Sequence, residues 1–219
     1  MRIIFVDGRI RRSADGEQCQ PVKDKDDRKS QRAPAIFTKM KSFQFDKLTE
    51  SATAIFRKAS DSKSASAELI PFFCAWFDCQ WGTYWHVDST KLLLTPAFCW
   101  GNESVRAEKL RRDTATRSLT LSEGTAGHVW QKGIPICTDN LVRDMCLPRS
   151  LDASESGLRG GIWFPIRTEQ RTYAVVELLG RHSWKRDERF IEALTVLGFE
   201  LGKVCASLSQ GLSTHRAAI

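Results

Sequence analysis

The chain has 219 residues, of which 42% are hydrophobic and 27% charged, and its net charge is +7. This balance supports one domain with a hydrophobic core and excludes a chain that is disordered throughout. No apolar run reaches the roughly 18 residues that span a bilayer, and the start lacks the cleavage site of a signal peptide. We therefore expect a cytoplasmic protein without a membrane partner.

The seven cysteines and four histidines do not form a metal-binding pattern. No Cys-x-x-Cys pair occurs, the histidines are scattered, and most cysteines stand in apolar surroundings. Such cysteines are typical of buried free thiols. The sequence thus predicts neither a structural zinc site nor a disulfide framework.

Residues 1–40 differ in composition from the rest of the chain. They hold ten Lys or Arg and six Asp or Glu, and almost no large apolar residue occurs between Arg9 and Arg32. We expect a disordered basic extension, or a mis-assigned start with the true initiator at Met40. The interspersed acidic residues, and the lack of aromatic residues interleaved with the basic ones between Arg9 and Arg32, do not favour nucleic-acid binding.

Two helices are predicted before the first strand. From residue 43 to 59 the apolar positions recur at helical spacing, which indicates an amphipathic helix. A second helix follows a polar break at residues 60–64, and Pro71 predicts either that it starts near Ile70 or that it kinks there.

The next stretch predicts a β-hairpin. Residues 81–88 alternate aromatic and β-branched side chains, and 92–100 supply an apolar partner strand after the turn residues between them. Pro96 cannot donate a backbone hydrogen bond, so we place its strand at a sheet edge or at a bulge. The charged segment from 105 to 115 is interpreted as a solvated surface helix.

A glycine-containing turn from Ser122 to Gly127 precedes a short helix that Gly133 is expected to end. The turn lacks the Gly-Lys-Ser/Thr of a Walker loop and the glycine spacing of a dinucleotide fingerprint. Phosphate chemistry is therefore not predicted here.

A second hairpin is formed by the apolar strands at residues 162–166 and 173–179. Such near-continuous apolar runs are typical of central strands covered on both faces. Glu177 is the exception, because a carboxylate among valines and leucines is costly unless it is paired. It is interpreted either as a residue at the rim of a pocket or as an outward residue paired with a surface cation.

Apolar residues continue at helical spacing from Lys185 to Gln210. This helix is longer than a small domain needs to cover its sheet, so we expect it to reach a partner or a second copy of the chain. Residues 211–219 are expected to form a disordered tail.

Taken together, these motifs resemble those of a GAF domain, a small-molecule-sensing module of signalling proteins. The resemblance rests on Trp81-Gly-Thr-Tyr-Trp-His-Val-Asp88, on Gly124-Thr-Ala-Gly127 followed by Val129-Trp130 and Asp139, and on the last hairpin. Ser122 departs from the pattern by replacing its first glycine. The resemblance implies an α/β (α+β) domain over residues 41–210, with a central antiparallel sheet of five or six strands, helices on one face and a lid, residues 140–156, on the other.

In the family this lid covers a ligand pocket. The residues that we predict to line it are mostly aromatic: Trp85, Phe98, Trp100, Trp130, Cys146, Leu147, Arg149, Trp163 and Glu177. We expect a non-catalytic sensory module that binds a small molecule, or that acts as a dimer through its terminal helices. The sequence does not identify a cofactor.

Two further functions are implied by subfamilies of the same fold. One subfamily reduces free methionine sulfoxide with cysteine chemistry, for which Cys146 and Cys137 would be the thiols, although Thr125-Ala126 replaces that subfamily's motif cysteine. The other attaches a bilin chromophore to a lid cysteine. Cys146 stands in the corresponding segment, but Leu147 replaces the histidine that normally follows.

Overall fold

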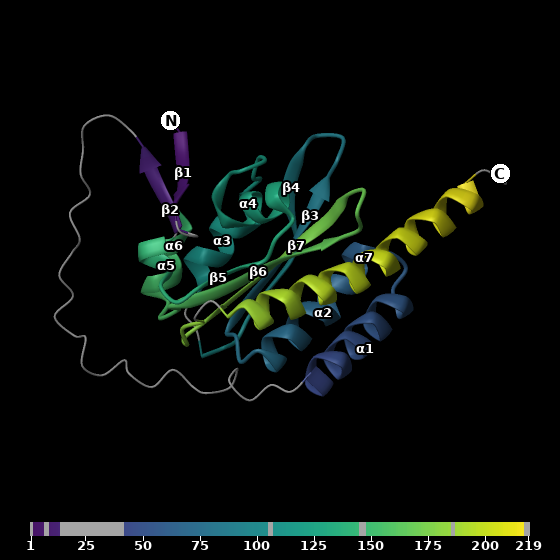
Figure 1. Cartoon of the computed structure of the whole chain (residues 1–219), viewed down its shortest axis with the longest axis horizontal. Helices are drawn as coiled ribbons and strands as arrows, with labels where there is room; N and C mark the ends of the chain where they lie inside the picture. Colours follow the sequence, from purple (N-terminus) through teal and green to yellow (C-terminus); the bar gives the residue numbers. More distant parts are fainter. Residues whose placement is uncertain are drawn as a thin grey trace.

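The computed structural model describes residues 2–6, 9–13, 42–104, 107–144, 148–184 and 187–216. Its centre is a five-stranded antiparallel sheet with the strand order β4-β3-β7-β6-β5 (Figure 1). The strands are β3 (Trp81–Asp88), β4 (Leu93–Gly101), β5 (Ile136–Thr138), β6 (Gly160–Arg167) and β7 (Thr172–Gly180). The expected sheet of five or six strands and both predicted hairpins are confirmed.

Three helices cover one face of this sheet, which we call the helix face (Figure 1). They are α1 (Ser42–Lys58), α2 (Ser62–Trp76) and α7 (Glu188–Arg216). Their contact with the sheet is mainly apolar, although it includes the buried hydroxyl of Tyr84, and Phe73 meets Phe164 edge to face with ring centroids 5.5 Å apart. The large side chains of this core are buried. It contains more residues than the core on the other face of the sheet, so it is the larger of the two hydrophobic clusters.

The opposite face, which we call the lid face, is covered by four shorter helices. They are α3 (Glu108–Thr116), α4 (Gly124–Lys132), α5 (Leu141–Asp144) and α6 (Pro148–Glu155). The predicted arrangement of helices on one face and a lid on the other is thus confirmed. The surface helix expected within residues 105–115 is confirmed as α3: its Lys and Arg side chains form the solvated face, while Leu110 and Thr114 are fully buried on the other side.

Pro71 left two possibilities for the second helix: a start near Ile70, or a kink there. Helix α2 starts earlier than the first possibility allows. Asp61 accepts hydrogen bonds from the backbone N–H groups of Lys63 and Ser64, which fixes the helix start at Ser62. The helix then runs through Pro71 to Trp76. The expected start near Ile70 was wrong because the capping box at its N-terminus and the buried apolar side chains outweigh one lost backbone bond.

Pro96 lies in edge strand β4, opposite Trp85, where the pairing with β3 shifts register. Both features that the proline predicted, an edge and a bulge, are therefore present. Helix α7 extends to Arg216, six residues past its predicted end, because the single Gly211 costs only about 1 kcal/mol in a helix. Residues 217–219 of the predicted disordered tail lie outside the described residues.

Most of the predicted N-terminal extension also lies outside the described residues. Within it the structure pairs β1 (Arg2–Val6) with β2 (Arg9–Ser13) as a separate two-stranded antiparallel sheet. The expectation of disorder for the remainder stays a prediction.

Candidate functional site

A row of side chains crosses the lid face of the three central strands. The register pairs Thr83 of β3 with Glu177 of β7, and Glu177 with Trp163 of β6. Successive strand residues alternate between the two faces of a sheet, so paired positions carry their side chains on the same face. The fold therefore places a carboxylate between a hydroxyl and an indole in the middle of a buried surface.

The carboxylate of Glu177 is 2% exposed and accepts hydrogen bonds from both neighbours in this row. Thr83 Oγ1 donates to Oε1 at 3.0 Å, and Trp163 Nε1 donates to Oε2 at 3.0 Å. Trp81 Nε1 in turn donates to Thr83 Oγ1 at 3.0 Å, which orients the hydroxyl hydrogen toward Glu177. The sheet alone thus holds the carboxylate in a fixed position.

Arg149 of α6 supplies the other half of the site. Its Nη2 donates to Glu177 Oε1 at 2.7 Å and its Nη1 to Oε2 at 3.2 Å, which is a bidentate pair. The guanidinium lies over the Trp85 ring, 5.1 Å from the ring centroid, and the Arg149 side chain is 5% exposed. The lid helix therefore reaches the sheet through one buried ion pair and one cation–π contact.

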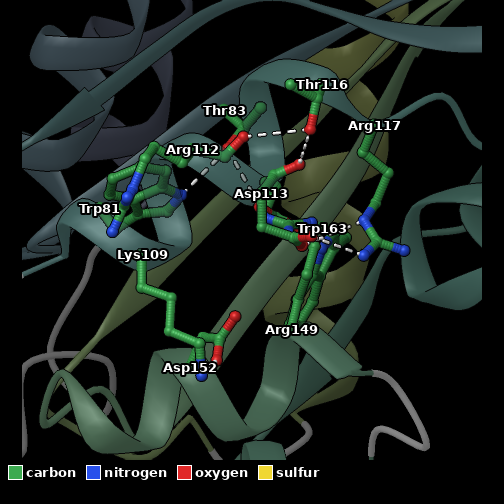
Figure 2. Close-up of polar contacts among 11 residues, drawn as sticks. Trp81, Thr83, Lys109, Arg112, Asp113, Thr116, Arg117, Arg149, Asp152 and Trp163 are labelled. Atoms are coloured by element: carbon green, nitrogen blue, oxygen red, sulfur yellow. Dashed lines mark hydrogen bonds and ion pairs between the residues drawn. The ribbon is translucent and has the colours of Figure 1, made fainter.

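A second, more exposed layer of charges joins α3 to α6 (Figure 2). Asp113 Oδ2 lies 4.0 Å from Arg149 Nε, and Asp113 also accepts two hydrogen bonds from Arg117. Lys109 pairs with Asp152 of α6 at 2.6 Å, although the lysine side chain is 67% exposed. The lid helix is thus tied to α3 at the surface and to Glu177 in the interior.

The electrostatics of the site keep Glu177 ionised. Burial by itself raises the pKa of this carboxyl, because it disfavours the charged form. The Arg149 charge and the hydrogen bonds from Arg149, Trp163 and Thr83 outweigh burial, so the net pKa is lowered. Glu177 is therefore an anion at neutral pH, and it acts as an acceptor only.

Apart from Arg149 Nε, which lies 4.0 Å from Asp113 Oδ2, two buried polar atoms beside this network have no hydrogen-bond partner among the described residues. They are Nε1 of Trp85, whose ring carries the Arg149 guanidinium, and Oγ1 of Thr114 on α3. Both residues are 0% exposed. Burying a polar group without a partner is unfavourable, so these atoms mark places where another polar group would be stabilising.

The structure brings together only part of the predicted pocket. Trp85, Arg149, Trp163 and Glu177 meet on the lid face, and Trp130 of α4 packs at the edge of the same cluster. Phe98 and Trp100 instead pack against the helix-face core. Cys146 and Leu147 lie outside the described residues.

Three residues of the site were missed from the sequence: Trp81, Thr83 and Asp113. The two-residue alternation with Trp85 could have identified Trp81 and Thr83, since all three share one face of β3. The same alternation would have assigned Phe98 and Trp100 to the opposite face from Cys99. Asp113 carries no local signal, because its contact with Arg149 depends on how α3 packs against α6.

The glycine turn before α4 has the backbone conformation that its composition predicts. Gly124 and Gly133 have φ values of +63° and +65°, and Gly133 ends α4 as expected. Ser122, which replaces the first glycine of the motif, also adopts a left-handed φ of +68°. A serine is strained in this region, whereas glycine is not.

The cysteines that the structure describes, Cys74, Cys79, Cys99, Cys137 and Cys205, are all free thiols. Burial raises the pKa of Cys74, Cys79 and Cys99, and raises that of Cys205 to about 12. Such thiols are poor nucleophiles at neutral pH. Across the described ranges no cluster of His, Cys, Asp and Glu could hold a metal ion, and none of the helices in those ranges is long and apolar enough to cross a membrane.

Comparison with solved structures finds the same fold at low sequence identity. A free methionine-R-sulfoxide reductase from Neisseria meningitidis, solved with its substrate, is 18% identical, with a TM-score of 0.59 over 77% of this chain and 92% of the reductase. A GAF domain of a phosphoenolpyruvate-protein phosphotransferase from Coxiella burnetii is 14% identical, with a TM-score of 0.60 over 80% and 99% of the two chains. An A. aeolicus GAF domain in an inactive state is 16% identical, with a TM-score of 0.57 over 74% and 95%.

A search of the curated proteins finds no significant match to this chain. The model of the GAF domain family, however, matches residues 68–204, which include the whole sheet, the lid helices and the first part of α7. The match covers more than half of the chain, and the chain belongs to the GAF domain family.

Proposed function

We propose that this chain is a non-catalytic regulatory domain that binds a small molecule between the lid face of its sheet and helix α6. The observation that carries the proposal is the buried Glu177–Arg149 pair inside a core made mostly of apolar side chains. A buried ion pair is weak as a source of stability, because desolvation cancels much of the attraction. The position of this ion pair at the centre of a sheet is better explained by a role in ligand recognition than by a role in stabilising the fold.

The unpartnered atoms of the lid face support the same proposal. Trp85 Nε1 is a buried donor beside the ion pair, and Thr114 Oγ1 is buried on the helix that faces it. Small-molecule sites combine aromatic walls with a few polar groups of this kind. In the described part of the chain, the helix face also holds two unpartnered buried polar atoms, Tyr84 Oη and His86 Nδ1. The buried Asp, Glu and Arg side chains among the described residues, however, all lie on the lid face: Arg149, Asp152 and Glu177.

Helix α7 is the candidate for passing the bound state to a partner. At 29 residues it is about 44 Å long, whereas the nine residues of β7 span about 30 Å. Figure 1 shows α7 continuing past the sheet toward the C-terminus. This length supports an output through a second copy of the chain or another signalling protein, in the cytoplasm where free thiols persist.

Reduction of free methionine sulfoxide is the second candidate function, because two structures with this fold, from N. meningitidis and Staphylococcus aureus, are such reductases. Burial raises the pKa of Cys74, Cys79 and Cys99, so these three thiols are poor nucleophiles for this reaction, and the hypothesis depends on the candidate thiols Cys146 and Cys137. Thr125 and Ala126, which replace that subfamily's motif cysteine, are buried in α4. The bilin hypothesis depends on Cys146 and stays a prediction.

Equilibrium dialysis of the purified protein against a small-molecule cell extract, read by mass spectrometry, tests the binding proposal. We expect the wild-type chain to enrich at least one compound, Glu177→Gln to lose it, and the control Lys91→Gln, in the exposed β3–β4 turn, to keep it. If no compound is enriched, or if Glu177→Gln enriches the same set, the proposal is wrong.

A thioredoxin-coupled assay with free methionine sulfoxide tests the second function. We expect no turnover. Turnover that Cys146→Ser abolishes would show that the chain is a reductase and would replace the regulatory proposal.

A further inference from the structure

The position of Glu177 is fixed by the sheet and not by the lid. Thr83 and Trp163 donate to its two oxygens from neighbouring strands, and both donors belong to strands that pair with β7 along their length. Removal of Arg149 would leave these hydrogen bonds in place. The carboxylate is therefore preorganised to accept two further donors from the direction of α6.

The flat face of Trp85 completes a receptor for a planar cation. The ring belongs to β3, is fully buried, and lies 5.1 Å from the guanidinium carbon of Arg149. A carboxylate that accepts two parallel N–H bonds, together with an aromatic face, matches the geometry of a guanidinium group. An ammonium ion is a point donor and matches only part of this arrangement.

Glu177, Thr83, Trp163 and Trp85 all belong to the sheet, and Arg149 is the residue of this site that comes from the lid. Helix α6 is otherwise tied down by the exposed Lys109–Asp152 pair and by apolar contacts such as Ala153. If Arg149 left the carboxylate while α6 stayed in place, Glu177 would remain as a buried charge without a counter-ion, which is strongly destabilising. A cation that took the place of Arg149 on Glu177 would remove this cost.

We propose that the Arg149 guanidinium occupies the binding position of the ligand in the ligand-free chain, and that the ligand is a small molecule ending in a guanidinium or amidinium group. The ligand displaces Arg149 from Glu177 and Trp85 and releases α6, so that the chain's own arginine holds the domain in its ligand-free arrangement. This inference rests on the proposed binding function and gives it a ligand class and a regulatory contact.

Chemical rescue with ethylguanidinium tests this proposal. Arg149→Ala removes the guanidinium and leaves space for the probe, so millimolar ethylguanidinium is expected to raise the Tm of this variant. The double variant Arg149→Ala/Glu177→Gln should not respond, because it lacks the carboxylate. Ethylurea, which is neutral and similar in shape, should have no effect on either variant.

The wild-type chain gives the second half of the test. Because Arg149 competes for the same carboxylate, the Kd for ethylguanidinium should be roughly tenfold or more weaker than in Arg149→Ala. Equal Kd values in the two chains, or an equal Tm rise in the double variant or with ethylurea, would overturn the proposal.

If Arg149→Ala does not fold, Arg149→Met, which keeps the apolar stem over Trp85, serves the same assay with the smaller guanidinium ion as the probe, because the methionine fills the space of the ethyl group. A measurement on the wild type is independent of both variants: in a chain with ¹⁵N-labelled arginine, ethylguanidinium should shift the Arg149 Nε–H signal to that of a solvent-exposed arginine. An unchanged signal at saturating probe would contradict the displacement. If the dialysis experiment enriches compounds without a guanidinium or amidinium group, this inference fails while the binding function stands.

Discussion

The two faces of the central sheet are buried with different chemistry. On the helix face, phenylalanines from α2 and β6 meet edge to face, and aliphatic residues of α7 fill the remaining space. On the lid face, three fully buried tryptophans surround a carboxylate and a guanidinium. The same three strands, β3, β6 and β7, supply both surfaces.

The comparison indicates that the two faces serve different purposes. An apolar core is stabilised in one arrangement by packing, and nothing in it responds to a change of ligand or charge. A buried charge pair is stable only while both members are in place. The lid face is therefore the part of the domain whose arrangement can be shifted by a competing ion.

The largest effect on stability should come from removing Glu177, the member of the Glu177–Arg149 pair that belongs to the sheet. Glu177→Ala leaves the buried Arg149 with only the more distant Asp113 as a counter-ion, so we expect urea denaturation to show a loss of about 3–5 kcal/mol in the free energy of unfolding. Phe164→Ala on the helix face should cost a similar amount, about 3–5 kcal/mol, through a cavity.

A second substitution distinguishes the loss of stability in Glu177→Ala from that in Phe164→Ala. Adding Arg149→Met should recover much of the stability lost in Glu177→Ala, because it removes the unpaired charge, and should recover none in Phe164→Ala. If Glu177→Ala alone stays within about 1 kcal/mol of the wild type, the pair is not the anchor of the lid.

Acid should weaken the lid face selectively. The folded-state pKa of Glu177 is lowered below its unfolded value of about 4.3. Its contribution to stability is therefore complete above that unfolded value, and is lost as the pH falls through the folded pKa. Unfolding curves measured from pH 7 to pH 3 should show a steeper loss in the wild type than in Glu177→Gln, and parallel curves would contradict the assignment.

The exposed Lys109–Asp152 pair between α3 and α6 should contribute less to stability than the buried Glu177–Arg149 pair. Lys109→Ala removes the contact with Asp152, but the lysine is largely in solvent, where water and salt screen the pair. We expect a change in the unfolding midpoint much smaller than that of Glu177→Ala, and one that disappears at high salt. A loss as large as that of Glu177→Ala would assign the anchoring role to the surface pair.

The smallest expected effect concerns the glycine turn. Ser122→Gly relieves a left-handed backbone conformation, and the flexibility gained by the unfolded chain cancels part of the benefit, so we expect a gain of about 0.5 kcal/mol. Thermal denaturation would detect it, and Ser122→Ala, which keeps the strain, is the matched control. A loss of stability in the glycine variant would show that the serine side chain has a further role.

The strands and the long helices could be predicted because their signals are local. The alternation in β3, the apolar run of β7 and the helical spacing before Gln210 each lie within one element. Glu177 was recognisable for the same reason, since a single carboxylate interrupts an apolar strand.

The site itself depends on long-range placement, which periodicity does not contain. Arg149 and Glu177 are 28 positions apart, and Thr83 and Glu177 are 94 apart. The register of β3 on β7 brings these residues together, and the packing of α3 against α6 adds Asp113. The misplacement of Phe98 and Trp100 came from grouping aromatic residues by type instead of by the face of the strand.

Native-state hydrogen exchange is the most direct test of whether the lid face opens on its own. If Arg149 holds α6 against an otherwise stable sheet, the amides of α6 should exchange through a local opening that needs less free energy than exchange in β6 or α2. Ethylguanidinium should speed exchange in α6 and leave that of β6 and α2 unchanged. If α6 exchanges only with global unfolding, at the same free energy as the helix-face core, then the lid does not open independently and the account of this domain as a ligand-responsive module is wrong.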